Sequence, residues 1–597
     1  MKRFALSLFF LASQAVLSAA PNVLLILTDD QGYGDLSIHG NPHLSTPNID
    51  RLGETGVRFD RFYVSSVCAP TRSALLTGRY TVRTGCHGVT HNREAMRPSE
   101  VTMAEALKSG GYRTGYVGKW HNGEQYPYTP QGQGFDEFFG FNNGHWNNYF
   151  DATLLRGATP EKTTGYISDV LTDEAIKFIS ASQEAPFFCY LAYNAPHSPY
   201  QVPDKYYDKF NAKGLDETLS AFYGMIENID DNVGRLMAHL EKSGLTENTL
   251  VLFLTDNGGT AGVKTYNAGM RGGKTSVHEG GSRVPLFMNW PGAKWPPHVA
   301  KPIVAHIDLY PTLLDLCGVK APEGPKVDGI SLRPLLEKDT AAGWPERTLF
   351  VHNPIGETNR YPGAVRTQQY RLVKEIKGPS AGSAAKPNDA SAEPWRLYDM
   401  EADPGQDKNI ANAHPELVKE LSTKYEAWVD DIFKDGLQRF LLPVGYKQHN
   451  PVELHAPQSF YDEPLHFASG PGFANDWLTG WTDAAAKVWF DVDVVEAGSY
   501  AVEIAGTCPP EDAGSKLRLT AGDATLETTM PAASIVEIPL PNRDAKSNER
   551  YRNREWTVLK LGQMDLKKGP VKLMLEAKFK PGSQVMDLKH VRLERIK

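Results

Sequence analysis

The sequence predicts an α/β domain with a largely parallel sheet, followed by a separate all-β module. From Pro21 to about Lys374, short apolar runs alternate with segments of helical periodicity, which is the pattern of α/β domains. From about Lys487, alternating runs such as VWFDVDV and SYAVEIAG are separated by Gly, Pro and Asp turns, which is typical of a β-sandwich. A chain of 597 residues is also too long for one hydrophobic core, so we expect more than one domain.

The individual elements follow from the length and periodicity of each run. Strands are expected at Val23–Leu27, Gly115–Val117, Phe187–Tyr193 and Leu250–Leu254, and helices at Val101–Ser109, Ile167–Ser180, Leu219–Ser243 and Leu417–Val429. The segment 378–394 is rich in Gly, Ala, Ser and Pro, which is typical of a flexible surface insertion. The expected organisation is an α/β domain at 21–376, an α+β subdomain at 377–450 that contains this insertion, and a β-sandwich accessory domain at 455–597.

The N-terminus has the layout of a secretory signal peptide, which we place at 1–20. Lys2 and Arg3 precede an apolar run from Phe4 to Leu11, and small residues follow up to Ala20. No later apolar run approaches the ~20 residues that span a bilayer, so no transmembrane segment is expected. The sequence contains no Asn-x-Ser/Thr glycosylation site. We therefore expect an exported protein, periplasmic or secreted, of bacterial origin.

Charge and cysteine content argue against two classes of protein. The formal net charge is -8 and no basic stripe is visible, so a nucleic-acid partner is not expected. The five cysteines are too few and too scattered for a disulfide framework.

Acidic side chains directly follow two of the expected strands. Asp29 and Asp30 follow the first strand, and Asp256 and Asn257 follow the last one. Ligands of open α/β sheets bind outside the carboxyl ends of the strands, so these four oxygen donors should meet at one place. Such a set suits calcium or magnesium better than zinc. Taken alone, either pair is better explained as turn formers or helix N-caps.

Basic side chains follow the other two expected strands. Lys119 and His121 come after the second strand and His197 after the third, while Lys274 lies in a Gly-rich loop. A lone lysine is usually solvated, and a lone histidine is often merely hydrogen-bonded. Their recurrence at strand ends beside the carboxylates instead indicates a site for a doubly charged oxyanion.

Cys68 precedes Pro70 and a short apolar run, which together indicate the start of a helix. At a helix N-terminus, backbone N–H groups favour an anion, and Arg72 would lie one turn later on the same face. The default interpretation of a lone cysteine is a buried structural residue.

The segment Cys-x-Pro-Thr-Arg followed by Thr-Gly-Arg resembles the signature of the type I, formylglycine-dependent sulfatases, arylsulfatase-like members of the alkaline phosphatase superfamily. Further blocks resemble the same family in the same order: NVLLILTDDQGYGD, TGYVGKWHNG, YNAPHSPY, LFLTDNGG, RGGKTSVHEGGSRVP, HIDLYPTLLDL, AVRTQQYRLVK and LYDMEADPGQDKN. The resemblance covers roughly residues 21–429. It implies an α/β/α sandwich with a small C-terminal antiparallel subdomain, to which the all-β sandwich is appended.

The resemblance also implies a sulfuric ester hydrolase whose nucleophile is a formylglycine, made from Cys68 by a formylglycine-generating maturation enzyme. One calcium ion would be bound by Asp29, Asp30, Asp256, Asn257 and the modified Cys68. The remaining site residues fall into two groups: Arg72 and Lys119, with His121 beside them, at the hydrated formylglycine, and His197 and Lys274 at the sulfate and the leaving oxygen.

Two positions depart from the family pattern. Thr71 stands where many relatives have Ser, which keeps a hydroxyl group in the signature. His278 stands where an aromatic residue, often Trp, is common. This leaves open how the Gly-rich loop that contains Lys274, the lysine loop, is packed.

Two alternative functions remain at this point. A phosphodiesterase or phosphonate hydrolase of the same superfamily would use zinc and a Ser or Thr nucleophile, and the Cys68 signature argues against it. A non-catalytic protein that binds sulfated glycans would keep Cys68 unmodified.

The substrate is expected to be a sulfated small molecule or polysaccharide. Specificity should lie in loops such as His91–Arg93 and Gly144–Tyr149, although such loops are as often structural. The appended module suggests a polymer and a role in carbohydrate binding. Trp481, Trp489 or Trp556 could stack on sugar rings, but core packing is the commoner role of each.

Overall fold

The computed structural model describes residues 20–182, 184–339, 341–353, 360–376, 392–437, 440–470 and 472–596. The expected signal peptide lies outside these residues except for Ala20, and so does the expected insertion up to residue 391. In the described part of the chain, no helix combines the length and the apolar character needed to cross a membrane.

The α/β domain is built on one mixed sheet of eleven strands, in the order β11-β2-β10-β8-β1-β7-β3-β4-β5-β6, with β9 paired to β2. The strands are β1 (Asn22–Thr28), β2 (Val57–Tyr63), β3 (Arg113–Lys119), β4 (Glu137–Phe141), β5 (Thr153–Arg156), β6 (Thr159–Lys162), β7 (Phe187–Ala192), β8 (Thr249–Thr255), β9 (Arg283–Val284), β10 (Leu286–Asn289) and β11 (His298–Ala305). Neighbours from β8 through β1, β7 and β3 to β4 are parallel. All four predicted strands lie in this parallel part, so their carboxyl ends meet at one edge of the sheet.

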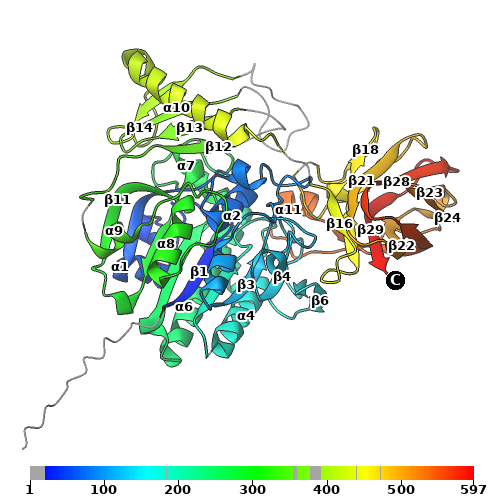
Figure 1. Ribbon diagram of the computed structural model, residues 1–597, viewed down its shortest axis with the longest axis horizontal. Coiled ribbons are helices and arrows are strands. Elements are labelled where there is room, and N and C mark those ends of the chain that lie inside the picture. Colours follow the sequence, from blue (N-terminus) through cyan, green and yellow to red (C-terminus); the bar gives the residue numbers. More distant parts are fainter. Residues whose placement is uncertain are drawn as a thin grey trace, which may run out of the picture.

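Helices cover both faces of the sheet, which gives the predicted α/β/α sandwich (Figure 1). Leu25 of β1 packs with α2, α3 and α8, whereas Leu24 packs with α1, α4 and α6, because successive strand residues point to opposite faces. The helices of this domain are α1 (Pro47–Thr55), α2 (Cys68–Thr77), α3 (Met103–Ser109), α4 (Ile167–Ala181), α5 (Asp204–Asn211), α6 (Glu217–Lys242), α7 (Glu279–Ser282), α8 (Leu309–Cys317) and α9 (Arg333–Glu337).

The predicted helices agree with α3, α4 and α6 to within two residues at each end. The start of α3 at Met103 rather than Val101 has a local cause. Thr102 and Glu105 form a capping box, in which the Thr102 hydroxyl accepts from the Glu105 N–H (3.1 Å) and the Glu105 carboxylate accepts from the Thr102 N–H (2.8 Å).

A small antiparallel sheet follows the α/β domain and packs against one long helix (Figure 1). The sheet has the order β12-β13-β14-β15. Its elements are β12 (Leu349–His352), β13 (Gly363–Arg366), β14 (Tyr370–Lys374), β15 (Arg396–Asp399) and the helix α10 (Pro415–Phe433), which contains the predicted amphipathic stretch.

The C-terminal part is a β-sandwich of two six-stranded sheets around one apolar core. One sheet contains β16 (Leu442–Val444), β18 (Phe460–Tyr461), β21 (Lys487–Val494), β23 (Lys516–Ala521), β24 (Ala524–Thr529) and β28 (Gly569–Phe579). The other contains β17 (Val452–His455), β19 (His466–Phe467), β20 (Leu478–Thr479), β22 (Gly498–Thr507), β27 (Thr557–Leu566) and β29 (Asp587–Arg595). A short hairpin, β25 (Glu537–Ile538) with β26 (Asn553–Arg554), flanks α11 (Ala545–Arg550). The sandwich begins with β16 at Leu442, thirteen residues before residue 455, where the sequence placed the start of the accessory domain.

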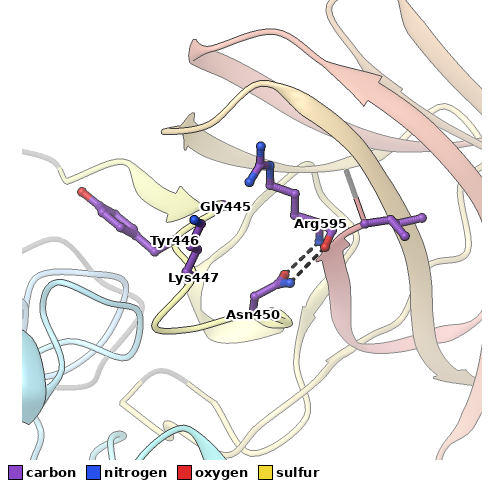
Figure 2. Close-up of a pocket in the computed structure, with 6 residues that line it drawn as sticks. Gly445, Tyr446, Lys447, Asn450 and Arg595 are labelled. Atoms are coloured by element: carbon purple, nitrogen blue, oxygen red, sulfur yellow. Dashed lines mark hydrogen bonds between the residues drawn. The ribbon is translucent and has the colours of Figure 1, made fainter.

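The loop between β16 and β17 is hydrogen-bonded to β29, the last strand of the sandwich. Asn450 accepts from the Arg595 N–H (2.8 Å) and donates to the Arg595 carbonyl (3.0 Å), as Figure 2 shows beside Gly445 and Tyr446. Figure 1 shows α11 on the side of the sandwich that faces the α/β domain.

Candidate active site

The four oxygen-donor residues meet at the carboxyl ends of β1 and β8. Thr28 and Thr255 are register partners, so the residues that follow them begin side by side. The Asp30 N–H donates to Asp256 Oδ1 (3.3 Å), and Asn257 Nδ2 donates to Asp30 Oδ1 (2.9 Å). Pairing of the two strands therefore brings together side chains that are more than 220 residues apart in the sequence.

This cluster has acceptor atoms without donors. Asp29 Oδ1 and Asn257 Oδ1 are buried and have no hydrogen-bond partner among the described residues. Burial and the neighbouring Asp29 carboxylate raise the pKa of Asp256 to about 7. Ligand atoms of Asp29, Asp256 and Cys68 all lie within 4.8 Å of one another. A hard cation with oxygen ligands would satisfy these atoms and neutralise the paired carboxylates.

Two cations lie on the buried side of the same cluster. Arg72 binds Asp256 Oδ2 through Nε (3.0 Å) and Nη2 (2.8 Å), and its Nη1 donates to the Lys119 carbonyl (2.8 Å). Lys119 Nζ lies 2.5 Å from Asp29 Oδ2. Burial acts to raise the pKa of Asp29, but nearby positive charge, foremost that of Lys119, outweighs it and lowers that pKa.

Lys274 and His197 lie where the cluster opens to solvent. Lys274 Nζ is 2.6 Å from Asp30 Oδ1, and His197 Nε2 is 3.7 Å from Asp30 Oδ2. Their side chains are 21% and 13% exposed, whereas those of Lys119 and Asp29 are fully buried. Of these four side chains, Lys274 and His197 are therefore the two that solvent reaches.

The two site histidines hold their protons on different ring nitrogens. His197 Nδ1 lies 2.5 Å from the Ser198 carbonyl, and His121 Nε2 lies 2.8 Å from the Val89 carbonyl. A carbonyl only accepts, so each of these nitrogens carries a proton. Nε2 of His197 and Nδ1 of His121 are left as acceptors. Burial lowers the pKa of both histidines, which favours the neutral form of each ring.

Cys68 is the first residue of α2, as predicted, and is 4% exposed. Burial raises the pKa of its thiol, and the charge of Lys119 acts in the opposite direction. Asn122 Nδ2 donates to the Ala69 carbonyl (3.1 Å), which attaches the loop that carries His121 beside Cys68. The structure thus gathers all the predicted site residues around one point at the edge of the sheet.

The family model described as "Sulfatase" matches residues 21–319, half of the chain, and the model "N-sulphoglucosamine sulphohydrolase, C-terminal" matches residues 273–430. The chain belongs to the sulfatase family. It is 32% identical to human arylsulfatase A over 468 residues, which cover 69% of this sulfatase and 89% of that protein. It is 29% identical to the uncharacterized sulfatase YdeN of Escherichia coli K12, over 69% and 85% of the two chains.

Solved structures agree with this assignment. The sulfatase is similar to Ps i-CgsB in complex with k-i-k-neocarrahexaose, with a TM-score of 0.61 and 29% identity over 69% of this chain and 93% of that one. The protein is thus a sulfuric ester hydrolase with the sulfatase α/β fold and an additional all-β part at the C-terminus.

No motif or periodicity in the sequence indicates the residues that the C-terminal part brings to this site. Tyr551 follows α11 and binds Ser198 Oγ through its hydroxyl (2.6 Å). Its ring meets His145 edge-on at 5.4 Å, and His145 stacks on His197 at 6.1 Å. Tyr551 lies in no family block and is 354 residues from His197 in the chain, so only tertiary packing joins them.

Both loops expected to carry specificity contact the β-sandwich. In the first, Asn92 Oδ1 accepts from Gln458 Nε2 (3.0 Å). In the second, Asn147 Nδ2 donates to the Arg552 carbonyl (2.8 Å), and the His145 carbonyl accepts from Asn475 Nδ2 (2.9 Å). The accessory domain therefore forms part of the surroundings of the active site.

The three tryptophans considered for sugar stacking have partners within the sandwich. Trp481 is fully buried and donates to the Ala486 carbonyl (3.1 Å). Trp489 is half-buried and stacks on Phe460, and Trp556 is half-buried against Trp477.

The two departures from the family pattern are accommodated locally. The Thr71 hydroxyl donates to the Ser65 carbonyl (3.1 Å). His278 is buried edge-on against Tyr398 and lies 3.2 Å from Glu375, so the lysine loop packs on the small antiparallel sheet.

Proposed function

We propose that this sulfatase hydrolyses sulfate esters of a carbohydrate, with a formylglycine made from Cys68 and one bound calcium ion. The observation that carries the proposal is the arrangement around Cys68: buried oxygen atoms without donors on one side and four basic side chains around them. Asp29, Asp30, Asp256 and Asn257 would hold the calcium ion. When present, the ion would polarise the sulfate and the hydrated aldehyde would supply the nucleophilic oxygen.

The chain's own residues would divide the remaining work by their position. Lys274 and His197, at the opening, would bind the sulfate as it enters. His197 Nε2 would then deliver a proton to the leaving oxygen, with its ring held in place by the Ser198 carbonyl. The charge of the bound sulfate raises the pKa of His197 and so favours the protonated ring that this step needs.

His121 would act on the buried side of the cluster, next to residue 68. Its Nδ1 is buried and has no hydrogen-bond partner among the described residues, so it can accept a proton. Arg72 and Lys119 would keep the neighbourhood of residue 68 positive through their contacts with Asp256 and Asp29. This arrangement separates the leaving-group side from the nucleophile side.

A carbohydrate substrate is supported by one comparison and by the accessory domain. The similar structure Ps i-CgsB was determined with k-i-k-neocarrahexaose bound. We infer that the β-sandwich of the present chain helps to form the substrate pocket, because it contacts both loops and the second loop stacks His145 on His197. The phosphodiesterase alternative loses support from the match to the sulfatase model.

The decisive experiment is mass spectrometry of the tryptic peptide Phe62–Arg72 from protein coexpressed with a formylglycine-generating enzyme. We expect an aldehyde at residue 68, stoichiometric calcium by elemental analysis, and loss of activity on sulfated saccharides in Cys68→Ala. An unmodified thiol in active enzyme would refute the formylglycine, and stoichiometric zinc at the Asp29 site would refute the calcium assignment. The proposed export is tested separately, by N-terminal sequencing of the mature protein from its native host.

A further inference from the structure

A second cluster of metal-binding side chains lies where the β-sandwich meets the α/β domain. His455 of β17 and His590 of β29 are register partners on neighbouring antiparallel strands, so both side chains leave the same face of the sheet. Glu453, two residues before His455, points to that face as well. Ligand atoms of these three residues all lie within 4.8 Å of one another. The opposite face of the same strands, with Leu454 and Val591, is buried in the sandwich core.

The α/β domain contributes a fourth group to this cluster. Glu124 lies in the loop after β3, three residues beyond His121, and its Oε2 is 3.6 Å from His455 Nε2. Glu453 Oε2 is 3.7 Å from the same nitrogen and 3.8 Å from His590 Nδ1. All three separations are longer than a hydrogen bond. Glu453 thus lies close to both histidines, and Glu124 lies close to His455, at separations beyond hydrogen-bond length.

The spacing of Glu453, His455 and His590 is close to that of a tetrahedral metal site. Zinc bonds of 2.0–2.2 Å place neighbouring ligand atoms about 3.3–3.6 Å apart in a tetrahedron. Glu453, His455 and His590 are close to this spacing, whereas Glu124 lies near His455 but outside the group of atoms within 4.8 Å, so its carboxylate would have to turn toward the other two. A set of two imidazoles and two carboxylates suits zinc.

The positive charges of Lys589 and Arg592 act on Glu453, and that of Lys589 on Glu124, but neither basic residue forms an ion pair with these carboxylates among the described residues. Arg592 is paired with Glu503 (2.7 Å) and Glu594 (3.0 Å), and Lys589 donates to the carbonyls of Asn475 and Asp476. Among the described residues, the basic group within 4 Å of Glu124 is His455, and those within 4 Å of Glu453 are His455 and His590. The Glu124 side chain is only 10% exposed, so its charge is costly without a partner.

We propose that Glu124, Glu453, His455 and His590 bind a structural zinc ion that joins the β-sandwich to the catalytic domain. Four protein ligands close the coordination sphere, which is the arrangement of structural rather than catalytic zinc. The ion would fix the loop after β3, which also carries His121. The neighbouring Gln125 already links this loop to the Glu453 carbonyl (3.1 Å) and to Gln458. This site is separate from the proposed calcium site and does not depend on the proposed function.

The test is titration of the full-length, zinc-depleted protein with Zn²⁺ at saturating calcium, against a chromophoric zinc chelator. We expect one site, and a thermal midpoint that rises when zinc is bound. The double variant His455→Ala/His590→Ala should bind zinc at least about 100-fold more weakly, because even changes outside the ligand set cost about 10–100-fold. His466→Ala, at an exposed histidine of the same sandwich, is the matched control and should bind zinc normally. Asp256→Asn should also keep the site, which separates it from the calcium site.

The proposal would be overturned if the wild-type protein bound no zinc in this titration. It would also be overturned if the double variant bound zinc as tightly as the wild type. If the double variant does not fold, two measurements decide in its place. His590→Gln should weaken zinc binding, and Co²⁺ added to wild type should give the visible absorption of a tetrahedral site. Failure of both would equally overturn it.

Discussion

The two site histidines differ in position, and this difference predicts how their variants respond to the leaving group. His197 lies at the opening with Nε2 free, and His121 lies on the buried side with Nδ1 free. General acid catalysis contributes about 10²–10⁴-fold where the leaving group needs a proton. We expect His197→Ala to lose far more activity on a sugar sulfate than on nitrophenyl sulfate, because nitrophenolate is stable without a proton.

The matched variant is His121→Ala, in which activity on both substrates should fall by a similar factor, because a proton acceptor beside residue 68 serves every substrate. The readout is the ratio of kcat/KM for the sugar sulfate over the aryl sulfate. A greater loss of this ratio in His121→Ala than in His197→Ala would mean that the roles are reversed.

At the scale of elements, the end of the lysine loop depends on one buried carboxylate. Glu279 begins α7, accepts from the Tyr63 hydroxyl (2.7 Å) and pairs with Arg371 Nη1 (2.8 Å) of β14. Arg366 of β13 lies 3.6 Å away, and all three charged side chains are almost completely buried. We expect Glu279→Ala to destabilise the protein by about 3–5 kcal/mol, because it leaves two guanidinium groups buried without their counter-charge.

Urea unfolding of Glu279→Ala measures this loss of stability. The KM of the variant should also rise, because the loop that contains Lys274 leads directly into α7. Glu420→Gln is the control: it removes an exposed pair with Lys424 of α10 and should cost less than ~1 kcal/mol. Similar losses in both variants would show that the Glu279 network does not hold the loop.

At the scale of the whole molecule, Tyr551 connects the β-sandwich to His197 through Ser198 and His145. Tyr551→Phe removes the hydrogen bond to Ser198, worth about 0.5–1.5 kcal/mol, and should lower kcat/KM for a sugar sulfate by a few-fold to about tenfold. Tyr551→Ala also removes the ring that supports His145 and should lower it further. Kinetics on a sulfated saccharide measure both effects.

Tyr500→Phe is the matched control, because this hydroxyl binds the Glu496 carbonyl within the sandwich and contacts neither specificity loop. Its kcat/KM should equal that of the wild type. Unchanged kcat/KM in Tyr551→Ala would show that the β-sandwich is an independent module with no part in the pocket.

The sequence by itself determined the α/β order, the position of Cys68 at a helix start, and the set of residues that the fold gathers at the proposed site. Apolar strands that each end in a polar group carry that information locally, because parallel strands align their carboxyl ends wherever the sheet forms. The contacts of the β-sandwich were decided only by the tertiary structure. Tyr551 beside Ser198, and Glu124 beside His455, are joined by the docking of two domains, and no local periodicity or motif records which surfaces dock.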